Sequence, residues 1–82
     1  MLVYKAAFKY VDGGVHAETL DFPGAITFGH DLPEARRLLA SVMVDLAELH
    51  LERGEPLPLP NPDLTSQDAD LEEPVTLSIG PK

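Results

Sequence analysis

The sequence predicts a two-layer α+β domain in which one long helix packs on a small β-sheet, with the element order βββαβ. Within residues 2–28, apolar and polar side chains alternate as in β-strands, in three runs separated by glycine-containing turns. Residues 32–53 repeat apolar side chains with helical spacing, and residues 75–80 alternate again as a last strand. We expect the 82 residues to form a single domain, in which residues 55–74 are a Pro-rich and acidic connection.

The first three strands are predicted to form an antiparallel meander. Residues 2–11 and 15–20 alternate cleanly, and the Asp-Gly-Gly sequence between them supplies the positive φ angles of a tight hairpin. A turn follows at residues 21–24, where the proline fixes φ and the next residue, a glycine, tolerates positive φ, as a type II turn requires. The third strand, residues 25–28, is therefore short.

The start and the end of the helix are both marked in the sequence. Asp31 is the predicted N-cap and Glu34 lies three residues later, which is the spacing of a capping box. Pro33 stands in the first turn, where its missing N–H is not needed. Gly54 is well placed as the residue that ends the helix after Arg53.

Two adjacent apolar stripes run along this helix. The first should lie on the sheet and consists of Ala35, Leu38, Leu39, Val42, Leu46 and Leu49. A small sheet can cover only one stripe, so the second either meets the C-terminal segment or forms a subunit interface in a homo-oligomer, a dimer or a tetramer. The residues of this second stripe are Ala40, Met43, Val44, Ala47 and Leu51.

The segment after the helix has a different composition. Proline occupies every second position from residue 56 to residue 62, which excludes a helix and favours extended, polyproline-like backbone. The last strand follows a helix, so we expect it to return by a right-handed crossover and to pair in parallel with the first strand.

The formal net charge of −8 disfavours direct binding to nucleic acid and favours a basic protein partner, although solubility alone also explains such a charge. Two acidic sets are candidates for binding a partner. One lies on the polar side of the helix and the other in the C-terminal segment: Asp45, Glu48 and Glu52, or Asp68, Asp70, Glu72 and Glu73. Without cysteine, a signal-peptide pattern or an apolar run of membrane-spanning length, the chain is expected to be cytoplasmic.

No pattern in the sequence predicts catalysis. The three histidines are not spaced as metal ligands, and no serine or threonine stands in a recognisable nucleophile motif. The carboxylates fit helix caps and solvated faces better than a paired acid and base. We therefore predict no catalytic residue, no metal site and no cofactor, and we expect a protein that is not an enzyme.

A series of turn, cap and strand residues resembles the signature of the HicB-like antitoxin family. It comprises Asp21, Pro23, Gly24, Thr27, Gly29, Asp31, Glu34 and Gly54. The resemblance implies a HicB-like fold and a protein that neutralises a small basic HicA-type toxin, which cleaves RNA. Family members typically carry a DNA-binding segment after this domain, but residues 54–82 fit no recognition helix, so binding to operator DNA is not expected.

The order βββαβ is also similar to a truncated ribonuclease H fold, whose chemistry needs metal-binding carboxylates that begin in the first strand. Residues 3–10 contain none, which argues against nuclease activity. The alternative to an antitoxin-like role is a stand-alone oligomeric domain that binds a small molecule or another protein.

Overall fold

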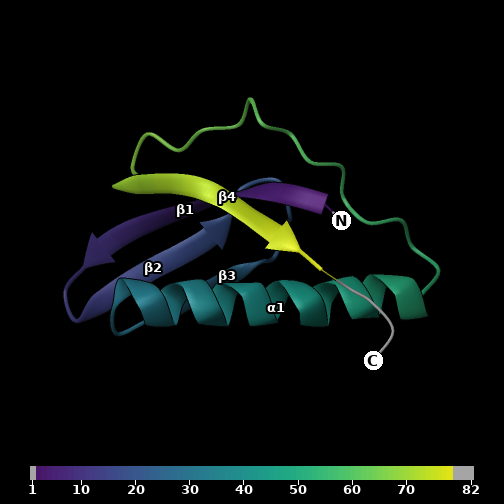
Figure 1. The fold of residues 1–82 in the computed structure, drawn as a ribbon, viewed down its shortest axis with the longest axis horizontal. Helices are drawn as coiled ribbons and strands as arrows, with labels where there is room; N and C mark the ends of the chain where they lie inside the picture. The colour runs from purple at the N-terminus through teal and green to yellow at the C-terminus, as the bar shows by residue number, and fades with distance from the viewer. Residues whose placement is uncertain (1, 79–82) are drawn as a thin grey trace.

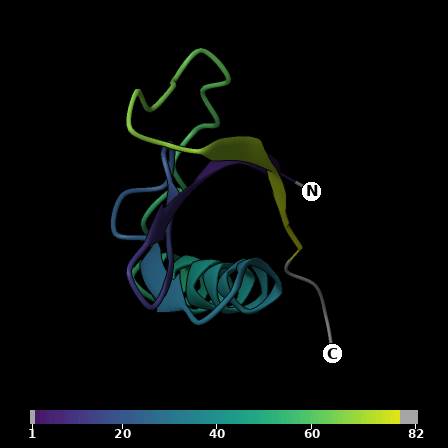
Figure 2. The ribbon, with the colours of Figure 1, turned by 90° about the vertical axis from the view of Figure 1, so that its left-hand side faces the viewer.

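The computed structural model describes residues 2–78, which form one four-stranded sheet covered on one face by a long helix (Figures 1 and 2). The elements are β1 (Leu2–Val11), β2 (Gly14–Thr19), β3 (Ile26–Gly29), α1 (Leu32–Glu52) and β4 (Leu71–Leu77). The strand order across the sheet is β3-β2-β1-β4, and every neighbouring pair is antiparallel. The predicted α+β class and the order βββαβ are confirmed.

The turn and the helix ends form as the sequence predicts. The N–H of Ala25 donates to the carbonyl of Phe22 at 3.2 Å and Gly24 has a φ of 90°, as a type II turn requires. Asp31 Oδ1 accepts from the N–H of Glu34 at 2.9 Å. At the other end, Gly54 has a φ of 70° and the N–H of Glu55 donates to the carbonyl of His50 at 2.8 Å. This last bond belongs to a Schellman motif.

The last strand runs in the opposite direction to the prediction, because β4 pairs with β1 antiparallel. Residues 53–70, here called the connecting segment, leave the end of α1 and return along the length of the molecule before β4 begins (Figure 1). Extended proline-rich backbone spans roughly 3.1 Å per residue, so the segment is long enough to cross a domain with a longest extent of 38 Å. A parallel strand would have needed a short return from the helix end.

Strand β4 also begins at Leu71, four residues before the predicted residue 75, and the predicted residues 79 and 80 lie outside the described part of the chain. The prediction began the strand after Pro74, whereas in the structure Pro74 lies within β4. It faces Lys5, whose N–H donates to Asp21 and whose carbonyl accepts from Leu20, both on the side away from β4. In an antiparallel pair of this kind the backbone of Pro74 points to the open edge of the sheet, where a missing N–H leaves no ladder bond unmade.

The helix packs on the sheet along a line between the two predicted stripes. Its buried residues are Ala35, Leu39, Met43 and Ala47. The assignment of Met43 and Ala47 to a subunit interface was therefore wrong, since both are buried within this chain. Close approach of the helix to β3 sets this line, because a Cβ on Gly29 would come within 2.5 Å of the backbone nitrogen of Ala35.

Candidate functional site

The two candidate acidic sets differ in whether their carboxylates make hydrogen bonds and ion pairs within the chain. In the C-terminal set, Asp70 Oδ2 accepts from the N–H of Tyr10 at 2.8 Å, and Glu72 Oε2 accepts from the N–H of Ser66 at 3.0 Å. Glu72 Oε1 also lies 3.7 Å from Lys5 Nζ. These carboxylates therefore hold the connecting segment and β4 in place.

Glu73 is the most strongly engaged member of the C-terminal set. The two oxygens of its carboxylate accept from Nε and Nη2 of Arg36, both at 2.8 Å, so that a bidentate ion pair ties β4 to α1. The hydrogen bonds to Glu73 raise the pKa of the Arg36 guanidinium above its ordinary value. Within this set only Asp68, which is exposed, makes no side-chain bond in the described part of the chain.

The carboxylates of the helix set, by comparison, make no such bonds within residues 2–78. Asp45, Glu48 and Glu52 are spaced by three and four residues, so they lie on one side of α1, and all three are exposed. Within residues 2–78, none of them takes part in an ion pair or a side-chain hydrogen bond. We call these three residues the acidic arc. The arc faces away from the sheet, since the opposite side of the helix forms the core.

The position of the acidic arc is unfavourable for the helix itself. Glu48 and Glu52 lie in the last turns of α1, near the negative end of the helix dipole, where cations are favoured and His50 is the basic residue of the last turn. The effect falls off within the last turn, so Glu52 costs a few tenths of a kcal/mol, up to about 1 kcal/mol, and Glu48, which precedes that turn, costs less. The stability of the helix therefore does not explain why carboxylates occupy these positions, and local rules are often broken in this way at functional sites.

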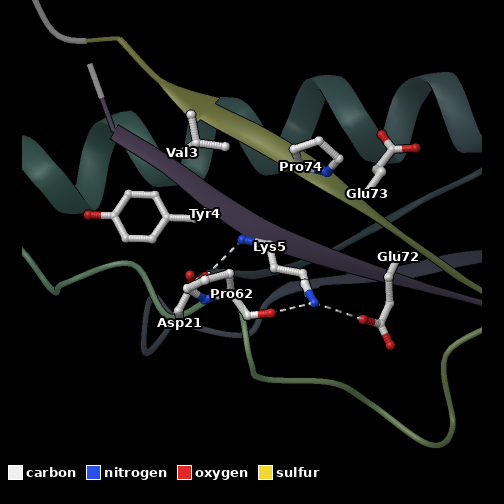
Figure 3. A pocket seen from close by; sticks show the side chains of 8 residues that line it. All are labelled: Val3, Tyr4, Lys5, Asp21, Pro62, Glu72, Glu73 and Pro74. Atoms are coloured by element: carbon white, nitrogen blue, oxygen red, sulfur yellow. Dashed lines mark hydrogen bonds and ion pairs between the residues drawn. The ribbon is translucent and has the colours of Figure 1, made fainter.

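Asp21 has a structural role that the sequence did not reveal. Its side chain is only 6% exposed, and its two oxygens accept from the N–H of Lys5 at 2.9 Å and from the N–H of Asn61 at 2.8 Å. The first bond, drawn in Figure 3, satisfies β1 beyond the end of its pairing with β2, and the second holds the connecting segment. A residue predicted for a turn thus joins three parts of the fold.

Tyr4 also holds the connecting segment, at Pro58, three residues before Asn61. Its hydroxyl donates to the carbonyl of Pro58 at 2.7 Å, and its ring meets Phe22 edge to face with centroids 5.2 Å apart. Burial and the neighbouring Asp21 carboxylate raise the pKa of the Tyr4 phenol above its ordinary value.

A cavity of about 350 Å³ opens beside these contacts, on the sheet face opposite α1 (Figure 3). Apolar and aliphatic surface forms most of its wall, from neighbouring positions of β1 and β4 and from the connecting segment. The polar groups at its edge are paired: Lys5 Nζ donates to the carbonyl of Pro62 at 2.8 Å and lies near Glu72. The lining residues are Val3, Tyr4, Lys5, Asp21, Pro62, Glu72, Glu73 and Pro74.

Two further kinds of site were sought in residues 2–78. No group of three or more His, Cys, Asp or Glu side chains comes together there as a metal site requires. No helix in this part of the chain is long and apolar enough to cross a membrane.

Among solved structures, the chain is similar to the N-terminal domain of the antitoxin HicB from Burkholderia pseudomallei, with a TM-score of 0.73. The match covers 95% of this chain and 100% of that domain, at 17% sequence identity. This chain has the HicB fold. The likeness extends over the whole of that N-terminal domain. No protein-family profile and no curated protein sequence matches the chain.

Proposed function

We propose that this chain is a non-enzymatic, antitoxin-like protein-binding domain that acts in the cytoplasm and neutralises a small basic HicA-type toxin. Its HicB fold supports a role of this general kind. The formal net charge of −8 suits a basic partner, because opposite charges attract over several ångströms and increase the rate of encounter. Neutralisation would follow from covering the basic surface that the toxin needs for RNA.

The acidic arc is the observation that carries this proposal. Within residues 2–78, its three carboxylates have no ion-pair partner and lie on one helix face, whereas Asp70, Glu72 and Glu73 are engaged. A row of carboxylates on a helix can substitute for the phosphates of RNA on a basic protein surface. RNA should therefore compete with this chain for the toxin rather than join the complex.

The test compares two double variants that remove the same charge. Glu48→Gln with Glu52→Gln neutralises two of the three carboxylates of the acidic arc, and Asp63→Asn with Asp68→Asn neutralises two exposed carboxylates of the connecting segment. Association with a HicA-type toxin is measured by stopped flow at low and at physiological salt. We expect the arc variant to associate about tenfold more slowly with a weaker salt dependence, and the control to change by less than about twofold.

A measurement of stability distinguishes the loss of a contact with the toxin from damage to the fold. Because the arc residues oppose the helix dipole, the Glu48→Gln, Glu52→Gln variant should unfold at the same or slightly higher denaturant concentration than the unchanged chain. Equal slowing by both double variants would show that net charge alone acts and that the arc is not the binding surface. If the unchanged chain neither binds HicA-type toxins nor relieves their toxicity when co-expressed, the proposed function is wrong.

A further inference from the structure

The two edges of the sheet differ in whether a further strand can add to them. At the β4 edge, Pro74 points its backbone outward and has no N–H to offer. The other edge is β3, whose four residues include no proline and no charged side chain (Figure 1). These two common means of blocking an edge strand are therefore both missing from β3.

The outward side of β3 carries free backbone groups. At its start the N–H of Thr19 donates to the carbonyl of Ala25 at 2.9 Å, and the bonds of an antiparallel ladder recur at every second residue. Thr27 therefore bonds to β2, whereas the backbone of Ile26 and of Phe28 points outward. The N–H of Ile26 donates within the preceding turn at 3.0 Å. The carbonyls of Ile26 and Phe28 and the N–H of Phe28 are left without a backbone partner within residues 2–78.

Two apolar side chains of β3 are open to solvent. Ile26 is 50% exposed and Phe28 is 46% exposed. Both lie on the sheet face away from α1, because Thr27 between them stands opposite the core residue Ala17. The ring of Phe28 lies against the backbone of Gly14, where an added Cβ would come within 2.4 Å of it. A strand added at this edge would cover both side chains.

A row of apolar side chains on α1 lies on the same side of the molecule as β3. Strand β3 runs antiparallel to α1, since a Cβ on Gly24, just before the strand, would lie 3.9 Å from Leu46, whereas Gly29, at its end, lies against Ala35. The opposite flank of the helix faces β4, to which Arg36 is tied. The row on the β3 side consists of Leu38, Val42, Leu46 and Leu49, none of which is fully buried.

Carboxylates without partners border this surface on both faces of the sheet. The acidic arc adjoins the apolar row, because Asp45 is three residues from Val42 and four from Leu49 on the helix. On the outer face, Glu18 stands opposite Ile26 and makes no ion pair or side-chain hydrogen bond within residues 2–78. A positively charged segment beside β3 would meet both negative groups.

We propose that the β3 edge and the adjoining flank of α1 bind an extended, basic segment of a partner protein, which adds to the sheet as a further strand. The free N–H and carbonyl of Phe28 fit an extended backbone, whose alternate side chains reach the outer face and the apolar row on α1. The carboxylates select lysine and arginine in that segment and disfavour a second copy of this acidic chain. The basic character of the partner is the one point at which this inference rests on the proposed function.

A synthetic peptide tests the contact without a toxin. The probe is a capped heptapeptide in which lysine and valine alternate, and the control peptide carries glutamate in place of each lysine. Each is titrated into the isotope-labelled full chain, and the backbone amides are followed by NMR. We expect the lysine peptide to bind below about 1 mM, to shift the amides of β3 most strongly and to slow the exchange of the Phe28 amide. No binding at about 1 mM, equal binding of the glutamate peptide, or shifts centred on β4 would overturn the proposal.

Two substitutions of one residue separate the backbone contact from the side-chain contact. Phe28→Val and Phe28→Pro both remove the ring, but only proline also removes the outward N–H. We expect Phe28→Pro to bind the lysine peptide about threefold to tenfold more weakly than Phe28→Val does. A lysine peptide methylated on every backbone nitrogen gives a second measurement on the unchanged chain, which does not depend on how a variant folds, and it should bind at least about tenfold more weakly than the unmethylated peptide. Equal affinities of the methylated and unmethylated peptides would refute strand pairing.

The same variants distinguish this inference from the proposed function. If Phe28→Pro neutralises a HicA-type toxin as well as Phe28→Val does, the toxin is not bound as an added strand, and this inference fails while the proposed function holds. If the lysine peptide binds at β3 but the unchanged chain neutralises no such toxin, the proposed function fails and the binding surface for a basic strand is supported.

Discussion

Replacing Asp21 by alanine should be the most damaging single change among the charged residues. Its buried carboxylate accepts two backbone N–H groups, from Lys5 at 2.9 Å and from Asn61 at 2.8 Å. A hydrogen bond to a charged group contributes about 1.5–3 kcal/mol, and the N–H groups left behind would be wholly or partly without partners. The expected loss is therefore about 3–5 kcal/mol of the free energy of unfolding, a large fraction of the stability of a domain this small.

Urea denaturation and hydrogen exchange measure this loss directly. Asp21→Ala should lower the midpoint strongly, and Asp21→Asn should fall between it and the unchanged chain, because an amide keeps one acceptor and turns a donor toward the other N–H. Asp63→Ala serves as the control, since this exposed side chain makes no bond in the described residues. The exchange rate of the Asn61 amide should rise in Asp21→Ala in particular.

Two results would refute this reasoning. One is a loss below about 1 kcal/mol for Asp21→Ala, which would mean that water satisfies both N–H groups without cost. The other is an equal loss for Asp63→Ala, which would mean that removal of negative charge, and not the buried contact, governs the change.

Three further changes test other parts of the fold. Met43→Ala should cost about 2–5 kcal/mol in urea denaturation because Met43 lies in the core, whereas an interface residue would leave the isolated chain nearly unchanged. Asp31→Ala should cost about 1 kcal/mol in thermal unfolding, through loss of the helix cap; an unchanged melting temperature would contradict the cap. The raised pKa of Tyr4 means that its contribution to stability is complete below the ordinary pKa of 10.0 and falls as the pH rises beyond it, so Tyr4→Phe should lose less stability between about pH 9 and about pH 11 than the unchanged chain.

Features that depend on neighbouring residues could be predicted from the sequence. The cap at Asp31, the turn ending at Gly24 and the helix end at Gly54 each arise from the conformational preferences of a few adjacent residues. Alternation likewise placed β1 at residues 2–11, as the structure has it. These local signals were sufficient for the class of the fold and for the resemblance to HicB.

Features that depend on distant residues could not be predicted in the same way. The direction of β4 follows from where the connecting segment is held by Tyr4 and Asp21, and both contacts join residues at least forty positions apart. The burial of Met43 follows from the close contact of Gly29 with α1, which helical periodicity alone does not contain. The pairing of Glu73 with Arg36 likewise removed one acidic candidate that composition could not distinguish from the acidic arc.

The outward backbone of Pro74 has a consequence for the chain at high concentration. An edge strand with regularly spaced free N–H and carbonyl groups is a template on which further chains add, and growth of that kind ends in fibrils. Pro74 removes the N–H at the middle of this edge, so that a second β4 cannot complete its hydrogen-bond ladder there. The edge formed by β4 is thereby protected against the addition of further chains, so that it does not start the growth of a fibril.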